Sequence, residues 1–79
     1  MKFHYHPDTD SLYIHLTDRS SVESEEVAPD IVFDFDADGA VVGIDIDHAS
    51  RLVNMEKLEI DFPQIHTLPL FRSFDRSLR

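Results

Sequence analysis

Two runs of alternating apolar and polar residues flank Asp38-Gly39, and they constrain the fold more than any other feature of the chain. A period of two is typical of β-strands, because successive side chains of a strand point to opposite faces. Asp-Gly tolerates the positive φ angles that a two-residue hairpin turn needs at both positions. The sequence therefore predicts a β-hairpin that closes with Phe35 opposite Val42. In that register Phe33 lies opposite Ile44.

A second β-hairpin is predicted at the N-terminus. Phe3 and Tyr5 alternate with polar residues. A turn-rich stretch follows at residues 7–10, and then Leu12 and Ile14 alternate in the same way. Pairing Tyr5 with Leu12 puts all four apolar side chains on one face, whereas a slip by one residue would mix the two faces. The register of this hairpin is therefore well specified.

The remaining elements complete the predicted sheet. One strand is predicted over residues 25–36, with Pro29 marking a bulge or an edge. A short helix over residues 48–54, N-capped by Asp47, is expected to cover the apolar face. Alternation over residues 58–62 favours a further strand. The sequence thus predicts an α+β fold: an antiparallel sheet of four strands, or five with the last segment, built from two β-hairpins and covered on one face by a short helix.

The length of the chain limits it to one domain. At 79 residues there is no room for two hydrophobic cores, and the absence of cysteine excludes disulfides and thiolate metal sites. We assign residues 1–62 to the domain and residues 63–79 to a C-terminal extension that is expected to dock on the domain or on a sister chain. Extra buried surface would compensate for a small core, which favours a homo-oligomer and first of all a dimer.

The chain is strongly acidic, with 16 Asp and Glu residues against 7 Lys and Arg residues and a net charge of -9. This balance argues against nucleic-acid binding, which depends on cations. Residues 1–71 hold fifteen acids and four cations, a net charge of -11, whereas residues 72–79 hold three arginines and one aspartate, a net charge of +2. The acidic body favours a basic protein partner. Because the chain lacks a signal-peptide core and an apolar run that could span a membrane, we expect a cytoplasmic protein without membrane contact.

Three stretches carry a resemblance to a known family. They are Tyr5 with Pro7-Asp8-Thr9-Asp10-Ser11-Leu12-Tyr13-Ile14, then Val32-Phe33-Asp34-Phe35-Asp36 with Gly39, and finally Val41-Val42-Gly43-Ile44-Asp45-Ile46 with Ala49-Ser50. Through them, residues 1–51 resemble the YuzE-like domains of unknown function, which are small bacterial and archaeal proteins. One departure is Asp45, where the family typically has a glutamate. The resemblance implies a compact antiparallel sheet with a short helix and no established activity. Some members are encoded beside small toxin-like proteins, so it also suggests an antitoxin role.

The central hairpin also matches the ligand spacing of a calcium loop. Positions 1, 3, 5, 6 and 12 of an EF-hand-like loop are occupied by Asp34, Asp36, Asp38, Gly39 and Asp45. That motif needs flanking helices and a glutamate at the last position, whereas period-two runs flank this one. We therefore interpret the aspartates as the solvated acidic face of a hairpin, and the calcium loop remains the less favoured alternative.

The candidate binding residues belong to the predicted outer face of the sheet: Asp34, Asp36, Asp45, Tyr13 and Gly43. Asp34 and Asp36 are two positions apart on one strand, so both are expected to point outward. Gly43, opposite Asp34, would allow another backbone to come close. Tyr13 is predicted to pack beside His4 as a cross-strand aromatic pair.

A metal site is the alternative use of the same face, with His4, His6, His15, Asp34 and Asp36 as candidate ligands. His4 and His6 project to one side of their strand, and His15 is predicted to lie diagonally across from them. Imidazole and carboxylate ligands suit zinc or nickel. His15 would alternatively serve as the base of a hydrolase, oriented by Asp34.

Two functions follow from these patterns. The favoured one is a small non-enzymatic, acidic protein-interaction module that binds a basic partner, as an antitoxin would, and it needs no cofactor. The alternative is a metal-binding protein or metal-dependent hydrolase that uses the outer-face histidines and aspartates.

Overall fold

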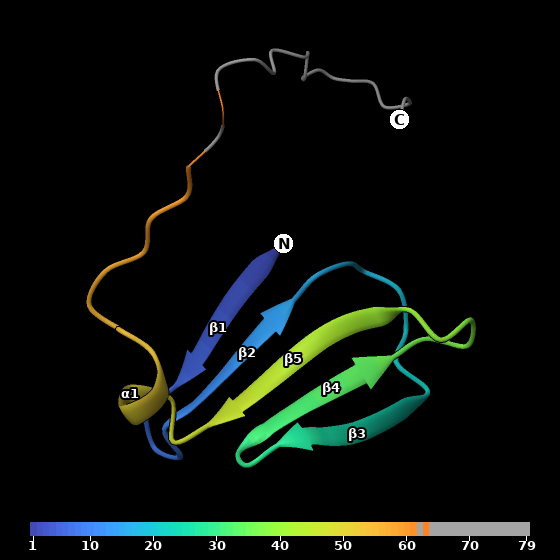
Figure 1. Ribbon diagram of the computed structural model, residues 1–79, viewed down its shortest axis with the longest axis horizontal. Coiled ribbons are helices and arrows are strands. Elements are labelled where there is room, and N and C mark those ends of the chain that lie inside the picture. Colours follow the sequence, from blue (N-terminus) through green and yellow to red (C-terminus); the bar gives the residue numbers. More distant parts are fainter. Residues whose placement is uncertain (62, 64–79) are drawn as a thin grey trace.

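The computed structural model describes residues 1–61 and 63. The elements are β1 (Lys2–His6), β2 (Ser11–His15), β3 (Glu23–Ala28), β4 (Ile31–Phe35), β5 (Val41–Asp47) and α1 (Ala49–Leu52). The strands form one antiparallel sheet of order β1-β2-β5-β4-β3, so β5 lies in its centre (Figure 1). The predicted antiparallel sheet is confirmed. The predicted docking of the 63–79 extension lies outside the described residues, apart from Pro63.

The N-terminal hairpin has the predicted register. Phe3 pairs with Ile14 and Tyr5 pairs with Leu12, so the apolar side chains of β1 and β2 share one face. The opposite face is polar because the alternation along both strands is strict. The alternation together with the four-residue turn was sufficient here, since a slip by one residue would mix the two faces.

The strand predicted over residues 25–36 is wrong in one respect, because it is two strands, β3 and β4. Ala28 pairs with Ile31, so Pro29 and Asp30 form a two-residue turn, and the register shift of this strand lies just before them, between Glu26 and Ala28. Proline fixes its own φ for the first turn position, and Asp30 adopts a positive φ of 68° at the second, which aspartate tolerates. The fifth strand of the sheet is therefore β3. Residues 58–61 form no strand, which corrects the prediction for residues 58–62 in its described part.

The hairpin between β4 and β5 has the predicted register in its inner part only. Asp34 pairs with Gly43 as expected, but Phe35 pairs with Val41 and not with Val42, because a bulge shifts the register. Of the two predicted turn residues only Gly39 has a positive φ, at 87°, and its N–H donates to the carbonyl oxygen of Asp36 at 3.0 Å. The loop is therefore three residues long, with a glycine bulge, rather than a two-residue turn.

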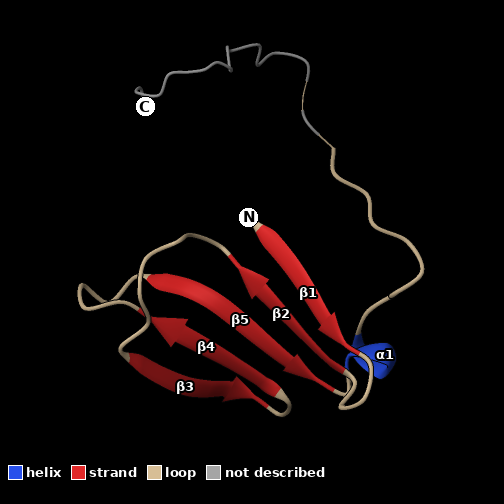
Figure 2. Ribbon diagram, turned by 180° about the vertical axis from the view of Figure 1, so that it is seen from behind, coloured by secondary structure: helices blue, strands red, loops and turns tan. Residues whose placement is uncertain are grey.

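Helix α1 is shorter than predicted and has a different N-cap. It is a single turn of four residues, and its N-cap is His48, with φ 54° and no side-chain capping bond, rather than Asp47. Asp47 is the last residue of β5. Both ribbon views place α1 at the end of the sheet where β1 turns into β2 (Figures 1 and 2). Within the described residues, no helix has the length and apolar character needed to cross a membrane.

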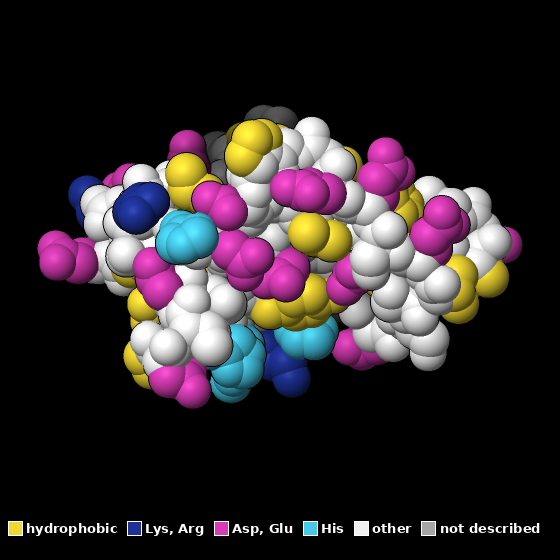
Figure 3. All heavy atoms as spheres, turned by 90° about the horizontal axis from the view of Figure 1, so that it is seen from below, with side chains coloured by type: hydrophobic (Ala, Val, Ile, Leu, Met, Phe, Trp, Pro, Cys, Tyr) yellow, Lys and Arg dark blue, Asp and Glu magenta, His cyan; other side chains and the backbone are white. Residues whose placement is uncertain are grey.

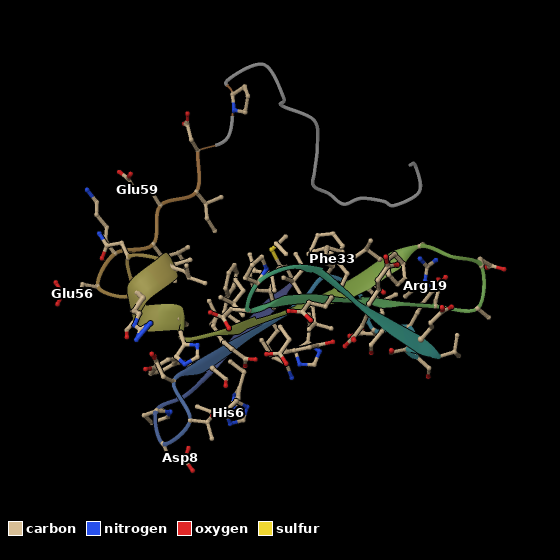
Figure 4. The ribbon with its side chains drawn as sticks, turned by 60° about the horizontal axis from the view of Figure 1, so that its bottom comes forward. His6, Asp8, Arg19, Phe33, Glu56 and Glu59 are labelled. Carbon is tan, nitrogen blue, oxygen red and sulfur yellow. The ribbon has the colours of Figure 1, made fainter. Side chains whose placement is uncertain are left out.

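The two faces of the sheet differ in chemistry, and the hydrophobic core is small. Leu12, Ile46 and Ala49 form the buried cluster, against which Ile14, Ile44 and Val53 pack. Phe33, which pairs with Ile44, belongs to the same apolar face, whereas His6 points to the other side of the sheet (Figure 4). The sheet is thus a single layer, and of α1 only Ala49 belongs to the buried cluster.

The left-handed conformation of Gly39 yields a stability prediction. Replacing Gly39 by alanine should lower the free energy of unfolding by about 1 kcal/mol, because a side chain disfavours a positive φ even where, as here, nothing crowds the new Cβ. Urea denaturation measures this change. Ala37→Ser, in the same exposed loop, is the matched control and should leave stability unchanged. Equal stability of both variants would contradict the loop conformation.

Candidate functional site

The polar face of the sheet brings together most of the predicted site residues. His4, Tyr13 and Asp45 lie side by side across β1, β2 and β5. One row further along, His15, Gly43, Asp34 and Ser24 lie side by side across β2, β5, β4 and β3. This arrangement confirms the predicted neighbours His4 and Tyr13 and the position of Gly43 opposite Asp34.

Tyr13 crosses over Gly43 to reach Asp34. Its hydroxyl donates a hydrogen bond to Asp34 Oδ2, and the Ser24 hydroxyl donates to Asp34 Oδ1 at 2.6 Å. A Cβ added at Gly43 would lie 2.6 Å from Tyr13 Cζ, so only glycine leaves room for the ring. We call Tyr13, Asp34 and Ser24 the polar bridge, because they connect β2, β4 and β3 over the central strand.

The aromatic contact of Tyr13 differs from the predicted one. Although His4 is its cross-strand neighbour, the Tyr13 ring stacks edge-on against His15, with the ring centroids 4.6 Å apart. His4 is in edge-on contact with His6 at 4.2 Å. The rings therefore pair along each strand, because the Tyr13 side chain leans toward Asp34 and away from β1.

Burial and negative charge keep Tyr13 protonated. Burial is the main cause that raises the pKa of Tyr13 to about 12, and the hydrogen bond to Asp34 and the charges of Asp34 and Asp45 add to it. Burial also raises the pKa of Asp45, with contributions from the charges of Asp47 and Asp34. At neutral pH the Tyr13 hydroxyl is therefore a hydrogen-bond donor and not a phenolate nucleophile.

Asp36 does not join the other candidate aspartates. Its side chain is only 7% exposed, and Oδ1 accepts hydrogen bonds from the backbone N–H of Asp38 and Ala40, both at 2.9 Å. Arg19 Nε lies 3.0 Å from Oδ2. The Ala40 hydrogen bond is the largest cause that lowers the pKa of Asp36, and the Asp38 bond and the Arg19 charge act in the same direction. Asp36 thus holds its own loop closed.

The predicted metal ligands are not assembled into a metal site. Across residues 1–61 and 63, no group of three or more histidine, aspartate or glutamate side chains is placed to hold an ion. Asp36 is engaged in its loop and Asp34 in the polar bridge. Acidic side chains nevertheless gather beside histidines on the surface seen from below (Figure 3).

A second cluster, which the sequence patterns did not single out, fixes α1 to the first turn. Asp10 accepts hydrogen bonds from the Tyr5 hydroxyl at 2.6 Å, the Ser50 hydroxyl at 2.7 Å and the Ser50 N–H at 3.1 Å. Its carbonyl accepts from Ala49 N–H at 2.9 Å. The Tyr5 and Ser50 hydrogen bonds lower the pKa of Asp10. We call Tyr5, Asp10 and Ser50 the aspartate clasp; all three stand in the stretches that carry the family resemblance.

An apolar groove lies on the opposite face of the sheet. Its volume is about 570 Å³, and its floor is formed by β1, β2 and β5 through Phe3, Tyr5, Leu12, Ile14 and Ile46. Residues 53–59, which follow α1, form its wall and include Glu56, Lys57 and Glu59. The structure therefore offers two different surfaces, one polar and hydrogen-bonded, the other apolar and open.

This sheet, with its polar bridge and aspartate clasp, defines a small antiparallel β-sheet domain stabilised by aspartate hydrogen bonds. The chain belongs to the family described as protein of unknown function DUF2283, whose model matches residues 2–50. It is also similar to an uncharacterised protein of Methanocaldococcus jannaschii, with 35% identity over 60 residues, which cover 76% of this chain and 51% of that protein. The chain thus spans about half the length of that relative. No solved structure matches the chain.

These comparisons confirm the predicted membership of a family of small domains of unknown function. The family match includes all five strands, the polar bridge and the aspartate clasp. It ends at Ser50, within α1, so residues 53–59 at the groove lie beyond it.

The polar bridge yields a titration prediction. Asp34→Asn should lower the pKa of Tyr13 from about 12 but leave it above 10.0, because the charge is removed while the larger contribution from burial remains. Tyrosine-selective NMR over a pH titration measures this. Asp38→Asn, in the exposed loop, serves as the control and should not change the titration. A Tyr13 pKa that is identical in both variants would contradict the bridge.

The aspartate clasp yields a prediction on acid stability. Because the pKa of Asp10 lies below its ordinary value of 3.8 in the folded chain, its ionised form stabilises the fold above that pH and this contribution is lost as the pH falls through the folded pKa. Asp10→Asn should therefore lower the thermal midpoint at neutral pH and reduce its decrease upon acidification. Thermal unfolding at several pH values between neutral and strongly acidic measures both effects. Asp8→Asn, in the same exposed turn, should follow the unmodified chain. If Asp10→Asn also follows it, the clasp does not stabilise the fold.

Proposed function

We propose that this chain is a non-enzymatic protein-interaction module that binds a basic protein partner through the apolar face of its sheet. The observation that carries the proposal is the partial cover of that face. Phe3 is 42% exposed and Tyr5 36% exposed, and no large side chain of the described residues is fully buried. A sheet with one apolar face is stable only when another layer covers that face. Contiguous exposed apolar surface of this kind is typical of interaction sites.

Acidic side chains border this apolar face. Glu25 pairs with Phe33 and Glu23 pairs with Phe35, so β3 presents two carboxylates at one edge of the face. Glu56 lies at the groove on the other side. Together with the net charge of -9, this border favours a partner that combines apolar and basic side chains. An antitoxin that neutralises a small basic toxin has this chemistry.

The hydroxyl contacts support a binding role over a catalytic one. Ser24 and Tyr13 both donate to Asp34, and Ser50 donates to Asp10. A hydroxyl nucleophile needs an adjacent base that is itself oriented by a third group. In these pairs each hydroxyl instead bonds a carboxylate that joins two segments of the backbone, so the contacts stabilise the fold.

Purification from native cells tests the proposal. A tagged chain should recover a basic protein at about 0.1 M salt and lose it toward about 1 M, because salt screens the attraction between charges. With that protein purified, Phe3→Ser should weaken binding about tenfold or more, since an exposed phenylalanine of the contact face is lost. Glu23→Lys with Glu25→Lys should weaken it and reduce its salt dependence.

The matched control is Val22→Ser, which removes an exposed apolar side chain from the loop before β3. Binding should be unchanged in this variant. Recovery of no basic protein at low salt would contradict the proposal. Equal losses for Phe3→Ser and Val22→Ser would show that the apolar face is not the contact surface.

A further inference from the structure

We infer that residues 64–79 of the same chain cover the apolar face in the free protein, so that a partner must displace them. Only the displacement rests on the proposed function. The docking itself is argued from the position of the groove, from the length of the remaining chain and from the distribution of charge.

The chain leaves the described part of the structure on the side of the apolar face. Residues 53–59, with the exposed Leu58 among them, form the wall of the groove, and the exposed Ile60 follows directly after it. Glu59 and Phe33 lie on one side of the sheet, whereas His6 and Asp8 lie on the other (Figure 4). The described part of the chain therefore ends on the side of the face that lacks a cover.

The remaining segment is long enough to cross the sheet. Five strands at about 4.8 Å spacing span roughly 19 Å from β1 to β3. The sixteen residues 64–79 span about 24 Å as a helix and more when extended. Either conformation reaches from the groove to the acidic border at β3.

The composition of the segment complements the face. Its apolar residues are Ile65, Leu68, Leu70, Phe71, Phe74 and Leu78. Its charged residues are three arginines and one aspartate, a net charge of +2, whereas residues 1–63 hold fifteen acids and four cations, a net charge of -11. The segment is therefore both apolar and basic, which complements the apolar face and its acidic border.

Charge and chain connectivity favour this segment over the sheet of a second copy. Two acidic bodies that meet face to face would bring like charges together. A segment tethered within the same chain acts at an effective concentration in the millimolar range for a short linker. On folding, a chain of this size buries only about 60% of the surface that its unfolded form exposes. Further apolar burial would therefore add substantially to its stability.

Paramagnetic NMR on the full chain tests the docking. The chain has no cysteine, so Ser77→Cys accepts a single nitroxide label. Methyl signals of Leu12, Ile14 and Ile44 on the apolar face should broaden strongly, whereas those of Val32 on the opposite face should broaden less. Adding Phe71→Ser and Phe74→Ser should lower the ratio of docked to free segment by about tenfold or more and restore the signals.

Three outcomes would overturn the inference. The first is an absence of broadening, and the second is equal broadening on both faces. The third comes from a mixture of two kinds of chain: one carries the nitroxide label, and the other carries only the NMR isotopes. Broadening in this mixture would show that the segment docks on a sister chain. The measurement uses the purified chain alone, so its failure leaves the partner proposal untouched. Failure to recover a partner likewise leaves this result unaffected.

A synthetic peptide of residues 64–79 provides an independent measurement. Calorimetric titration should show that it binds the Phe71→Ser/Phe74→Ser chain more tightly than the unmodified chain, whose own segment already occupies the face. A peptide with the same two serine substitutions is the matched control and should bind neither chain measurably. Equal affinity of the unmodified peptide for both chains would contradict occupancy of the face by the segment.

Discussion

The pairing of β5 with both β2 and β4 determines the chemistry of the whole molecule. Because β5 is central, its register decides which side chains of four strands share a face. One face receives the aliphatic and aromatic residues of the groove, and the other receives the polar bridge. Gly43 connects this register to the bridge, since Tyr13 reaches Asp34 only across a position without a side chain. A slip of one residue would move Gly43 to the apolar face and break the bridge.

The aspartates of this acidic chain are used unequally. Asp10 and Asp36 accept backbone N–H groups at turns, where regular strand partners are missing, and Asp34 accepts two hydroxyls. These carboxylates hold the backbone in place and are not free to attract a ligand. The charge available to a partner lies instead on residues without such contacts, of which Glu23 and Glu25 border the apolar face. A count of acidic residues therefore overstates the negative charge that a partner could contact, and it does not show where on the sheet that charge lies.

Sequence patterns predicted what depends on period-two alternation and failed where side chains take part in turns. The β1–β2 register and the pairing of Asp34 with Gly43 followed from alternation alone. The Asp38-Gly39 turn was wrong because Asp36 bonds the loop amides and favours a three-residue loop. The division at Pro29 was missed because a proline in a polar strand suits a bulge as well as a turn. The diagonal Tyr13–Asp34 contact depends on how three strands are paired in space. The sequence pattern therefore indicates that Gly43 is special, but not that the Tyr13 ring crosses it.

The family match separates the floor of the groove from what surrounds it. All the floor side chains lie within the match, whereas the wall at residues 53–59 and the segment after it lie beyond. The apolar face is therefore a consequence of the sheet that lies within the family match, whereas residues 53–59 and the C-terminal segment follow that match in the sequence. A single apolar face is stable only when another layer covers it. On the docking proposed above, a change in the C-terminal segment would alter that cover without altering the sheet. In this chain the segment is basic and apolar, which fits an acidic border.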